Sequence, residues 1–481
     1  MPSSPQQSPR SAAAAAFTRR GFLRGSLGAG AALTMGSGLL AGCGGDDSNV
    51  TKTGLDAYRS AGIDWKQAKG ATINIAVIPA TYFTNLIELF PQFEKLTGVK
   101  VTAEQIPPQQ IRKKVVLDLS TKGKQFHTHA ADPMYYPLYA KNKWITPLAS
   151  FLDDDKLTDP DWFDLEDIIP QWRESATVDD KLYAIPYDGE VTLQVYRTDL
   201  YKKAGLKPAE TLEEYAANAK ELNNPDKRIW GAALRGQPGA GQNMYIYPSL
   251  FREFGGEWFD EAGKPTINSD AGVEALTWYV DLLTSVAPKA VTNWNWPDIA
   301  DAFAQGTLGS YIDAHSSAAV LLDRQKSVVV DKLGFARWPA GPTGKRVTSI
   351  WNWGFPINGA VPREEQVATW LFIQWAASKE TQIRTSYAFG GDAKRSGVNR
   401  TSLWESEKYR SSVDAGQDFV PAVQDSLAED QDLDWRPRVP QWPAIGDRMA
   451  VAVQEALTGQ GKPKEILDKV NRQVADIVGR G

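Results

Sequence analysis

Residues 181–199, KLYAIPYDGEVTLQVYRTD, constrain the fold more than any other stretch of the sequence. A short apolar strand runs into Pro186, and a second strand rich in β-forming residues follows over residues 191–196. Proline cannot donate to a sheet ladder, so we expect the chain to leave one sheet at Pro186 and to enter another afterwards. Asp188 and Glu190 lie between the two strands. The stretch therefore predicts a crossing between two domains, with two carboxylates in the crevice.

The length and composition agree with a multidomain globular protein. A chain of 481 residues predicts about two to four domains, and 42% hydrophobic with 23% charged residues describes a folded protein. The net charge is −5. Residues 1–42 hold four Arg and no acid, so their removal leaves 49 basic and 58 acidic residues, a net charge of −9. An acidic protein of this kind argues against a nucleic-acid partner.

The N-terminus predicts an export signal rather than a fold element. Residues 18–24, TRRGFLR, resemble a twin-arginine signal, and a Gly/Ala-rich apolar run follows over residues 25–42. The run ends in Leu-Ala-Gly-Cys43, which resembles a lipobox and contains the only cysteine of the chain. The alternative is a transmembrane anchor, but this run is short and weakly apolar. We therefore expect residues 1–43 to be a lipoprotein signal with a lipid on Cys43, and residues 44–70 to be a flexible tether.

Helices and strands alternate through the rest of the chain, which predicts an α/β protein. The near-continuous apolar run at residues 72–79 is typical of a strand buried on both faces of a parallel sheet. Further strands are expected at residues 99–104, 191–196, 309–313, 333–339 and 349–357. Helices are expected from the spacing of apolar residues and from capping residues at 86–96, 111–120, 211–222, 269–284, 297–306, 362–375, 443–459 and 463–477.

An ordered set of short motifs resembles one family. The motifs are Pro186 with Glu190, Tyr196-Arg197, Ala204-Gly205-Leu206, Thr211 with Glu214, Phe93-Glu94-Lys95, Ala302-Phe303-x-x-Gly306 and Pro339-Ala340-Gly341-Pro342. Together they resemble the extracellular solute-binding proteins, family 1, of ABC importers, in the sugar-binding branch that includes maltose-binding protein. The resemblance covers residues 70–480. It implies a two-lobed periplasmic-binding-protein-like fold of type II whose hinge has several crossings. The implied lobes are residues 71–187 with 348–392, and residues 188–347 with 393–481.

The resemblance also implies a binding site between the lobes. Sugar hydroxyls need paired donors and acceptors, and sugar C–H faces need aromatic surface. The candidates by position are Tyr82, Phe83, Asp188, Glu190, Asn243, Tyr245, Trp296, Asp313, Trp351, Trp353, Arg395 and Trp442. For Trp296 and Trp442 a place in the core is an equal alternative. A stacking Trp of the maltose branch is absent near Ser316, so a maltodextrin is not the expected ligand.

Signatures of catalysis and of cofactors are weak or missing. There is no G-x-S-x-G motif, and residues 341–346, GPTGKR, lack the spacing and the Ser/Thr of a phosphate loop. His127 and His129 have only His315 as a third imidazole, so loop histidines are expected rather than zinc ligands. We therefore expect no metal, no cofactor and no enzymatic activity. Two alternatives stay open: an exported carbohydrate-active enzyme that uses Asp188 and Glu190, and a receptor for another solute such as a peptide or polyamine.

The sequence thus predicts a lipid-anchored, monomeric solute receptor at the extracytoplasmic face of a bacterial cell membrane. It is expected to capture a sugar, small glycoside or sugar alcohol and to deliver it to the transmembrane subunits of an ABC permease.

Overall fold

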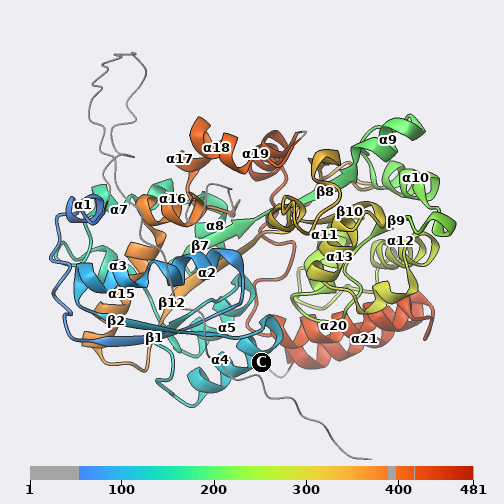
Figure 1. Cartoon of the computed structure of the whole chain (residues 1–481). Helices are drawn as coiled ribbons and strands as arrows, with labels where there is room; N and C mark the ends of the chain where they lie inside the picture. The colour runs from blue at the N-terminus through green and yellow to red at the C-terminus, as the bar shows by residue number, and fades with distance from the viewer. Residues whose placement is uncertain (1–53, 388–396, 417, 480–481) are drawn as a thin grey trace, which may run out of the picture. The chain divides into compact units, whose positions relative to one another are not determined.

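The computed structural model describes residues 54–387, 397–416 and 418–479. Asn49–Gly481 form one compact unit, in which two separate sets of sheets are covered by helices (Figure 1). Cys43 and Arg395 lie outside the described residues. No helix in the described part of the chain combines the length and the apolar character that a membrane crossing requires.

The first lobe contains a parallel sheet in which β1 (Thr72–Val77) lies between β2 (Lys100–Gln105) and β3 (Thr128–His129). Because β1 has a neighbour on each side and helices against its faces, its Ile73, Ile75 and Val77 are completely buried, as the apolar run predicts. The helices of this lobe are α1 (Asp56–Arg59), α2 (Thr81–Glu88), α3 (Phe90–Thr97), α4 (Pro108–Ser120), α5 (Tyr136–Lys141), α6 (Ala149–Leu152), α7 (Pro160–Phe163), α8 (Pro170–Ser175), α15 (Arg363–Ala377) and α16 (Lys379–Tyr387).

A second sheet of this lobe places the chain for the crossing. The long strand β12 (Trp351–Asn358) pairs antiparallel with β4 (Ile145–Thr146) and with β7 (Ala184–Glu190). Ala131, just after β3, and Gly354 of β12 exchange two backbone hydrogen bonds of 2.9 Å, which connects the two sheets. The hairpin of β5 (Thr177–Val178) and β6 (Lys181–Leu182) precedes β7.

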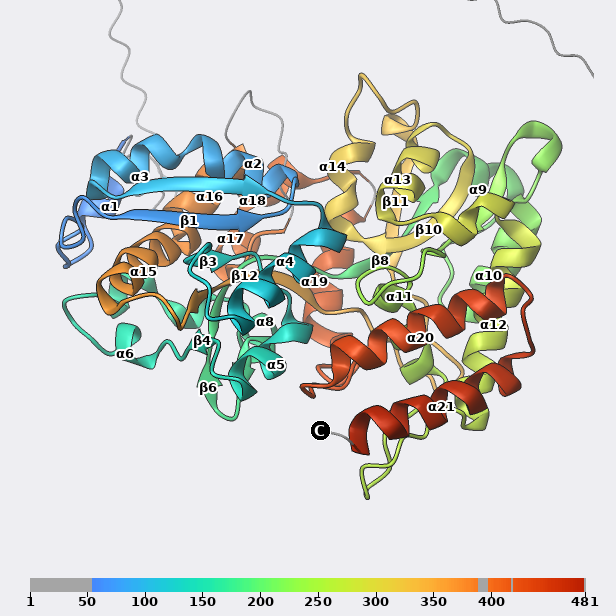
Figure 2. The ribbon, with the colours of Figure 1, turned by 90° about the horizontal axis from the view of Figure 1, so that it is seen from below.

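The second lobe is built on a four-stranded sheet in the order β11–β8–β10–β9. Its strands are β8 (Thr192–Arg197), β9 (Trp230–Ala233), β10 (Leu308–Ala314) and β11 (Leu333–Arg337). Figure 2 shows α20 and α21 lying next to each other along this lobe. Its helices are α9 (Thr198–Ala204), α10 (Leu212–Leu222), α11 (Asn243–Glu253), α12 (Asp270–Val286), α13 (Trp296–Ala304), α14 (Ala318–Leu321), α19 (Phe419–Glu429), α20 (Trp442–Leu457) and α21 (Pro463–Gly479). The short helices α17 (Thr401–Glu405) and α18 (Glu407–Val413) lie on the side of the first lobe in Figures 1 and 2, and the Ser402 amide of α17 donates to Asp167 Oδ1 at 2.8 Å.

The crossing between the two sheets lies at Val191 and not at Pro186, which corrects the expectation from the sequence. β7 continues through Pro186 to Glu190, and β8 begins at Thr192. β7 lies at the edge of its sheet, and an edge strand tolerates a proline, which has no N–H to donate. The register of β12 against β7 shifts between Trp353 and Gly354, and this bulge accommodates the region around Pro186.

A second crossing runs beside the first and is bonded to it. It leads from β11 through residues 338–350 into β12. The Thr192 amide donates to the Thr348 hydroxyl at 2.8 Å, and the two threonine hydroxyls lie 2.7 Å apart. The Ser349 amide donates to the Thr192 hydroxyl at 3.1 Å. The resemblance also implies a third crossing at residues 390–397, and all of it but Gly397 lies outside the described residues.

The segment before β1 is part of the folded lobe from at least Tyr58 onward, which corrects the tether expected up to residue 70. Tyr58 is completely buried, and its hydroxyl lies 3.0 Å from the Thr381 hydroxyl of α16. The indole N–H of Trp65, also buried, donates to the Tyr58 carbonyl at 2.7 Å. These two aromatic residues anchor the segment because they fill the core beside Trp375.

The expected helix boundaries are confirmed where capping residues defined them. α3 ends at Gly98, which has a φ of 73° and so occupies the left-handed region that glycine tolerates. α10 begins after Thr211, whose hydroxyl accepts from the Glu214 amide at 3.2 Å.

Candidate ligand-binding site

A cavity of about 170 Å³ is lined by residues of both lobes. The first lobe contributes the loop from β1 into α2, the start of α4, the end of β7 and the start of β12. The second lobe contributes the segment between β9 and α11, the start of α13, and the end of β10 with the turn into α14. Both β1 and β10 deliver their carboxyl ends to the cavity, which is where α/β sheets bind ligands.

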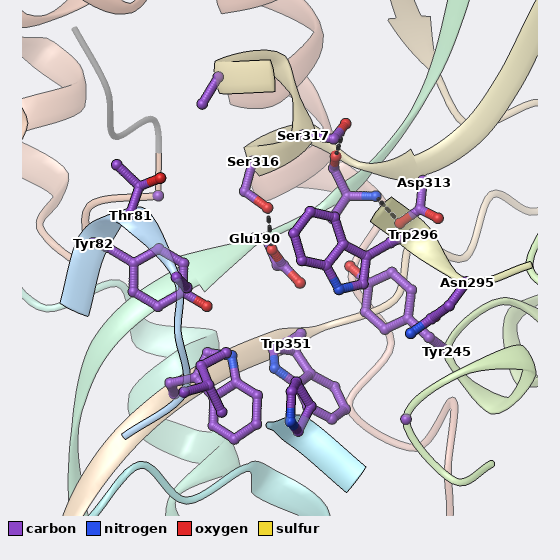
Figure 3. A pocket seen from close by; sticks show the side chains of 18 of the residues that line it. Thr81, Tyr82, Glu190, Tyr245, Asn295, Trp296, Asp313, Ser316, Ser317 and Trp351 are labelled. Atoms are coloured by element: carbon purple, nitrogen blue, oxygen red, sulfur yellow. Dashed lines mark hydrogen bonds between the residues drawn. The ribbon is translucent and has the colours of Figure 1, made fainter. Parts of the chain in front are cut away.

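Aromatic side chains form several walls of the cavity. Tyr82 and Trp296 lie on opposite sides of it, with Glu190 between them (Figure 3). Trp351 and Trp353 are two residues apart on β12 and point to the same face, their rings 5.5 Å apart. Aromatic faces of this kind bind the C–H surface of a sugar or polyol.

An ion pair holds one polar wall in place. The Arg235 guanidinium follows β9 and donates through Nε to Asp313 Oδ2 at 2.8 Å and through Nη2 to Asp313 Oδ1. Both side chains are almost completely buried. Arg235 also lies over the ring of Tyr245, with its Cζ 4.0 Å from the ring centroid. The pair is bidentate and stacked, so it presents fixed donors and acceptors at the cavity surface.

The first lobe contributes a second ion pair. Arg112 of α4 lines the cavity, and its Nε donates to Asp132 Oδ2 at 2.8 Å. Its guanidinium also lies 5.6 Å from the ring centroids of both Trp351 and Trp353. Arg112 is therefore electrically compensated before any ligand arrives, while it braces the two tryptophans from one side.

Glu190 ends β7 at the cavity, and its carboxylate differs from that of Asp313. Among the residues that the structure describes it forms no ion pair; it accepts a hydrogen bond from the Ser316 hydroxyl (Figure 3). Burial raises the pKa of Glu190 to about 7, although Ser316, the charge of Arg235 and the nearby Tyr245 hydroxyl act to lower it, and Asp313 raises it further. Part of the Glu190 side chain is exposed to solvent, because it faces the cavity and not the protein core. Near neutral pH this carboxyl thus exchanges readily between its two protonation states.

Most of the site residues expected from the sequence meet at this cavity. Those that line it are Tyr82, Glu190, Tyr245, Trp296, Asp313, Trp351 and Trp353.

Four expected residues lie elsewhere. Phe83 is completely buried and stacks on Tyr187, 5.4 Å between centroids, because α2 turns it into the core. Asp188 is buried behind Gly397. The two residues are so close that a Cβ on Gly397 would lie 2.5 Å from Asp188 Oδ1. Asn243 begins α11 and donates to the Ala450 carbonyl at 2.9 Å. Trp442 is fully buried against Trp258, so of its two alternatives the structure adopts the core.

Several lining residues were not anticipated: Arg112, Arg235, Gln242, Asn295, Ser316 and Ser317. For two of them, Arg235 and Asn295, the sequence contains a pattern that could have predicted a place in the site. Arg235 follows the apolar strand sequence WGAAL, just as Asp313 ends the strand sequence LGSYID, and a charge at the carboxyl end of a strand marks a site. Asn295 directly precedes Trp296 and forms a capping box with Asp298, so the same helix start positions both. Arg112 and Gln242 have no comparable signal.

The histidines do not form a metal site in the structure. His127 lies 3.1 Å from a carboxylate oxygen of Glu365, and burial lowers the pKa of His129 to about 3. Within the described ranges no group of three or more His, Cys, Asp or Glu side chains is placed to bind a metal ion.

Known proteins with similar sequences bind small solutes. The chain is 27% identical over 425 residues to the mannitol-binding protein of Pseudomonas aeruginosa, covering 85% of this chain and 93% of that one. It is 25% identical over 338 residues to the erythritol/L-threitol-binding protein of Mycolicibacterium smegmatis, covering 67% and 70%.

A solved structure has the same fold. The solute-binding protein of Agrobacterium radiobacter in complex with ribitol superposes with a TM-score of 0.78 at 25% identity, covering 85% of this chain and 99% of that one. The family model of the bacterial extracellular solute-binding proteins matches residues 80–383. The chain therefore belongs to the bacterial extracellular solute-binding proteins, which are binding components of ABC importers and not enzymes, and it has their two-lobed type II α/β fold.

Proposed function

We propose that this protein captures a small, neutral sugar alcohol of four to six carbons between its lobes and delivers it to an ABC permease. One observation carries the proposal: a single cavity combines aromatic faces with charged side chains that are already paired with each other. A polyol offers what this lining requires, a chain of C–H groups with a hydroxyl on each carbon that both donates and accepts.

The size of the cavity supports a small ligand. Its volume of about 170 Å³ is close to the ~150 Å³ of a cavity that holds benzene, and far below the volumes that drug-sized ligands occupy. A short polyol or a monosaccharide suits this space, and an oligosaccharide does not.

The charges of the lining support a neutral ligand. Arg112 is paired with Asp132 and Arg235 with Asp313, so neither arginine requires an anionic ligand. Glu190, with a pKa of about 7, takes a proton near neutrality. A polyamine or a peptide with charged termini is therefore unfavourable. Its charges would be buried in the cavity without a free charge of opposite sign to pair with.

The relatives named above as mannitol-, erythritol- and ribitol-binding proteins support a sugar alcohol over a cyclic sugar. In this proposal Tyr82, Trp296, Trp351 and Trp353 contact the carbon chain, while the polar residues of both lobes bind its hydroxyls. The boundary between the lobes lies at the crossing Val191, so Glu190 belongs to the first lobe, which also includes the segment from Tyr58 to β1. The protein acts as a monomer, held at the outer face of the membrane by lipid on Cys43.

Isothermal titration of the purified soluble domain with a panel of solutes tests the proposal. We expect binding to one or more of erythritol, ribitol and mannitol, and at least tenfold weaker or no binding to maltose, spermidine and a dipeptide. Tight binding of any of the last three solutes, with no response to the sugar alcohols, would contradict the proposed ligand class.

Replacing Trp296 tests the aromatic wall. Trp296→Ala should weaken binding of the best sugar alcohol by about 1–3 kcal/mol because it removes a face that contacts the carbon chain. Trp294→Ala is the matched control, since Trp294 lies two residues earlier, is equally half-buried, and lies outside the cavity. Equal losses of affinity in the two variants would remove Trp296 from the site. Melting temperatures of both variants exclude a general loss of fold.

Titration of Glu190 should make binding depend on pH. Ligand hydroxyls donate to the ionised carboxylate, so bound ligand lowers its pKa from about 7. Affinity therefore rises with pH from the lowered pKa up to about 7 and is constant above it. We expect roughly a tenfold change in affinity per unit by which the ligand lowers the pKa. The sign is opposite for the ligand-free protein, whose stability falls as pH rises through 7, because a raised pKa favours the folded state only when Glu190 is protonated.

Calorimetry at several pH values checks this dependence, and Glu190→Gln should bind with an affinity that is nearly constant from pH 5.5 to 8. Among the described residues, the groups that act on the pKa of Glu190 are Arg235, Tyr245, Asp313 and Ser316. The same pH dependence in Glu190→Gln would assign the titration to another group.

The lipid anchor has its own test. Cys43→Ser should move the full-length protein from the membrane fraction to the soluble fraction, because the thiol that would carry the lipid is lost. Fractionation and immunoblotting measure the distribution, with Ser48→Ala as a control for substitution near the N-terminus. A Cys43→Ser protein that still sediments with salt-washed membranes would show that the lipobox interpretation is wrong.

A further inference from the structure

A buried arginine lies directly behind one wall of the ligand cavity. The Cζ of Arg436 is 4.0 Å from the ring centroid of Trp435 and 5.0 Å from that of Trp351, so the guanidinium lies against both indoles. Arg436 is 4% exposed and does not line the ligand cavity. It is separated from that cavity by Trp351.

The charge of Arg436 has no contacting counter-ion among the residues that the structure describes. Its Nη1 contacts the sulfur of Met134 at 3.4 Å, and its Nε has no hydrogen-bond partner in that part of the chain. Asp132 is the acidic group whose charge raises the pKa of Arg436, but no ion pair joins the two in this part of the chain: Asp132 Oδ2 is bound to Arg112, and its Oδ1 has no hydrogen-bond partner there. Burial lowers the pKa of Arg436 to about 9, so the side chain is still a cation at neutral pH. An isolated buried cation of this kind is costly.

Arg436 lines a small second cavity of about 30 Å³. One side is closed by Trp442, which is fully buried and whose indole N–H also lacks a partner among the described residues. Ser175 and Arg438, two further polar side chains of the lining, are engaged. Ser175 donates to the Trp172 carbonyl at 2.6 Å and accepts from Asn352 at 2.7 Å, and Arg438 bonds to Glu174 and the Thr177 carbonyl.

We propose that this cavity is a binding site for one small monovalent anion, a halide, held by the Arg436 guanidinium and the Trp442 indole N–H. The unengaged groups are donors, and a halide accepts from both without needing an acceptor in return. A water molecule would need acceptors for its own hydrogens, and it would leave the charge of Arg436 uncompensated. The volume fits a single occupant of about water size.

The position gives the anion a structural consequence. Because Arg436 lies over Trp351, an anion that holds the guanidinium in place also restrains the ring that forms a wall of the ligand cavity. The anion therefore stabilises the ligand-free protein and does not enter the ligand cavity.

Thermal unfolding without any sugar alcohol tests the site, so its result is independent of the ligand. Sodium bromide replaces sodium gluconate at constant ionic strength, since gluconate is too large for the cavity. Once bromide exceeds its Kd, each further tenfold rise should increase Tm by roughly 1–2 °C. Arg436→Gln and Trp442→Phe should lose or strongly reduce the increase, whereas Arg324→Gln, on an exposed arginine paired with Asp331, should retain it.

Bromide-soaked crystals give a second measurement. An anomalous peak between Arg436 and Trp442 supports the site. A Tm that does not change with bromide, or a crystal with no peak there, overturns the proposal in favour of water. If Arg436→Gln fails to fold, Trp442→Phe decides, because it removes one donor and keeps the ring.

Discussion

The structure depends on the crossing at Val191, where a single residue connects strands of two different sheets. The Val191 amide donates to His315 Nδ1 at 3.1 Å, and the His315 amide donates to the Val191 carbonyl at 2.9 Å. These bonds join the crossing to the end of β10, so Glu190 and Asp313 are brought to the same cavity. On the other side, the register of β7 against β12 pairs Glu190 with Trp351. The site is thus assembled by backbone pairing at the place where the lobes join.

Arg112 and Arg235, which line this cavity, are each paired with an aspartate before a ligand binds. Burying Arg235 with Asp313, and Arg112 with Asp132, costs desolvation energy that their mutual attraction offsets only with good geometry. The bidentate contact of Arg235 and its stacking on Tyr245 supply that geometry. Side chains held in this way lose little further entropy when a neutral ligand binds, so more of the binding energy of its hydroxyls appears as affinity.

The sequence predicted the fold well because apolar runs and caps are local signals. The strand at residues 72–79, the cap at Gly98 and the start of α10 at Thr211 all depend on neighbours in the chain. The predicted position of the crossing is wrong because a proline ends a central strand but not an edge strand, and the sequence does not show that β7 lies at a sheet edge. The tether was misjudged because Tyr58 is anchored by Thr381, a residue far along the chain.

The candidate site was predicted less completely, for a related reason. Tyr82 after the first strand, Asp313 at the end of a strand and Trp353 on the strand after the second crossing were expected from the family resemblance, and all three line the cavity. Arg112 lies near the start of α4. It lines the cavity because α4 packs where Arg112 can pair with Asp132, and this contact between distant segments has no local signal in the sequence. Asp188 and Glu190 look equivalent in sequence, but Gly397 covers the first and leaves the second facing the cavity.

The two carboxylates that line the cavity show how the same chemical group acquires different tasks. Asp313 receives two hydrogen bonds from a guanidinium, so its charge is compensated by the protein itself. Glu190 receives one from a hydroxyl, and burial raises its pKa to about 7. Ionising Glu190 is therefore unfavourable until further donors approach it. In the proposed complex those donors are the hydroxyls of the ligand, so enclosing a polyol lowers the cost of ionising this carboxylate. A ligand without hydroxyls at this position would leave that cost in place, so Glu190 selects for hydroxyl groups beside the crossing that joins the lobes.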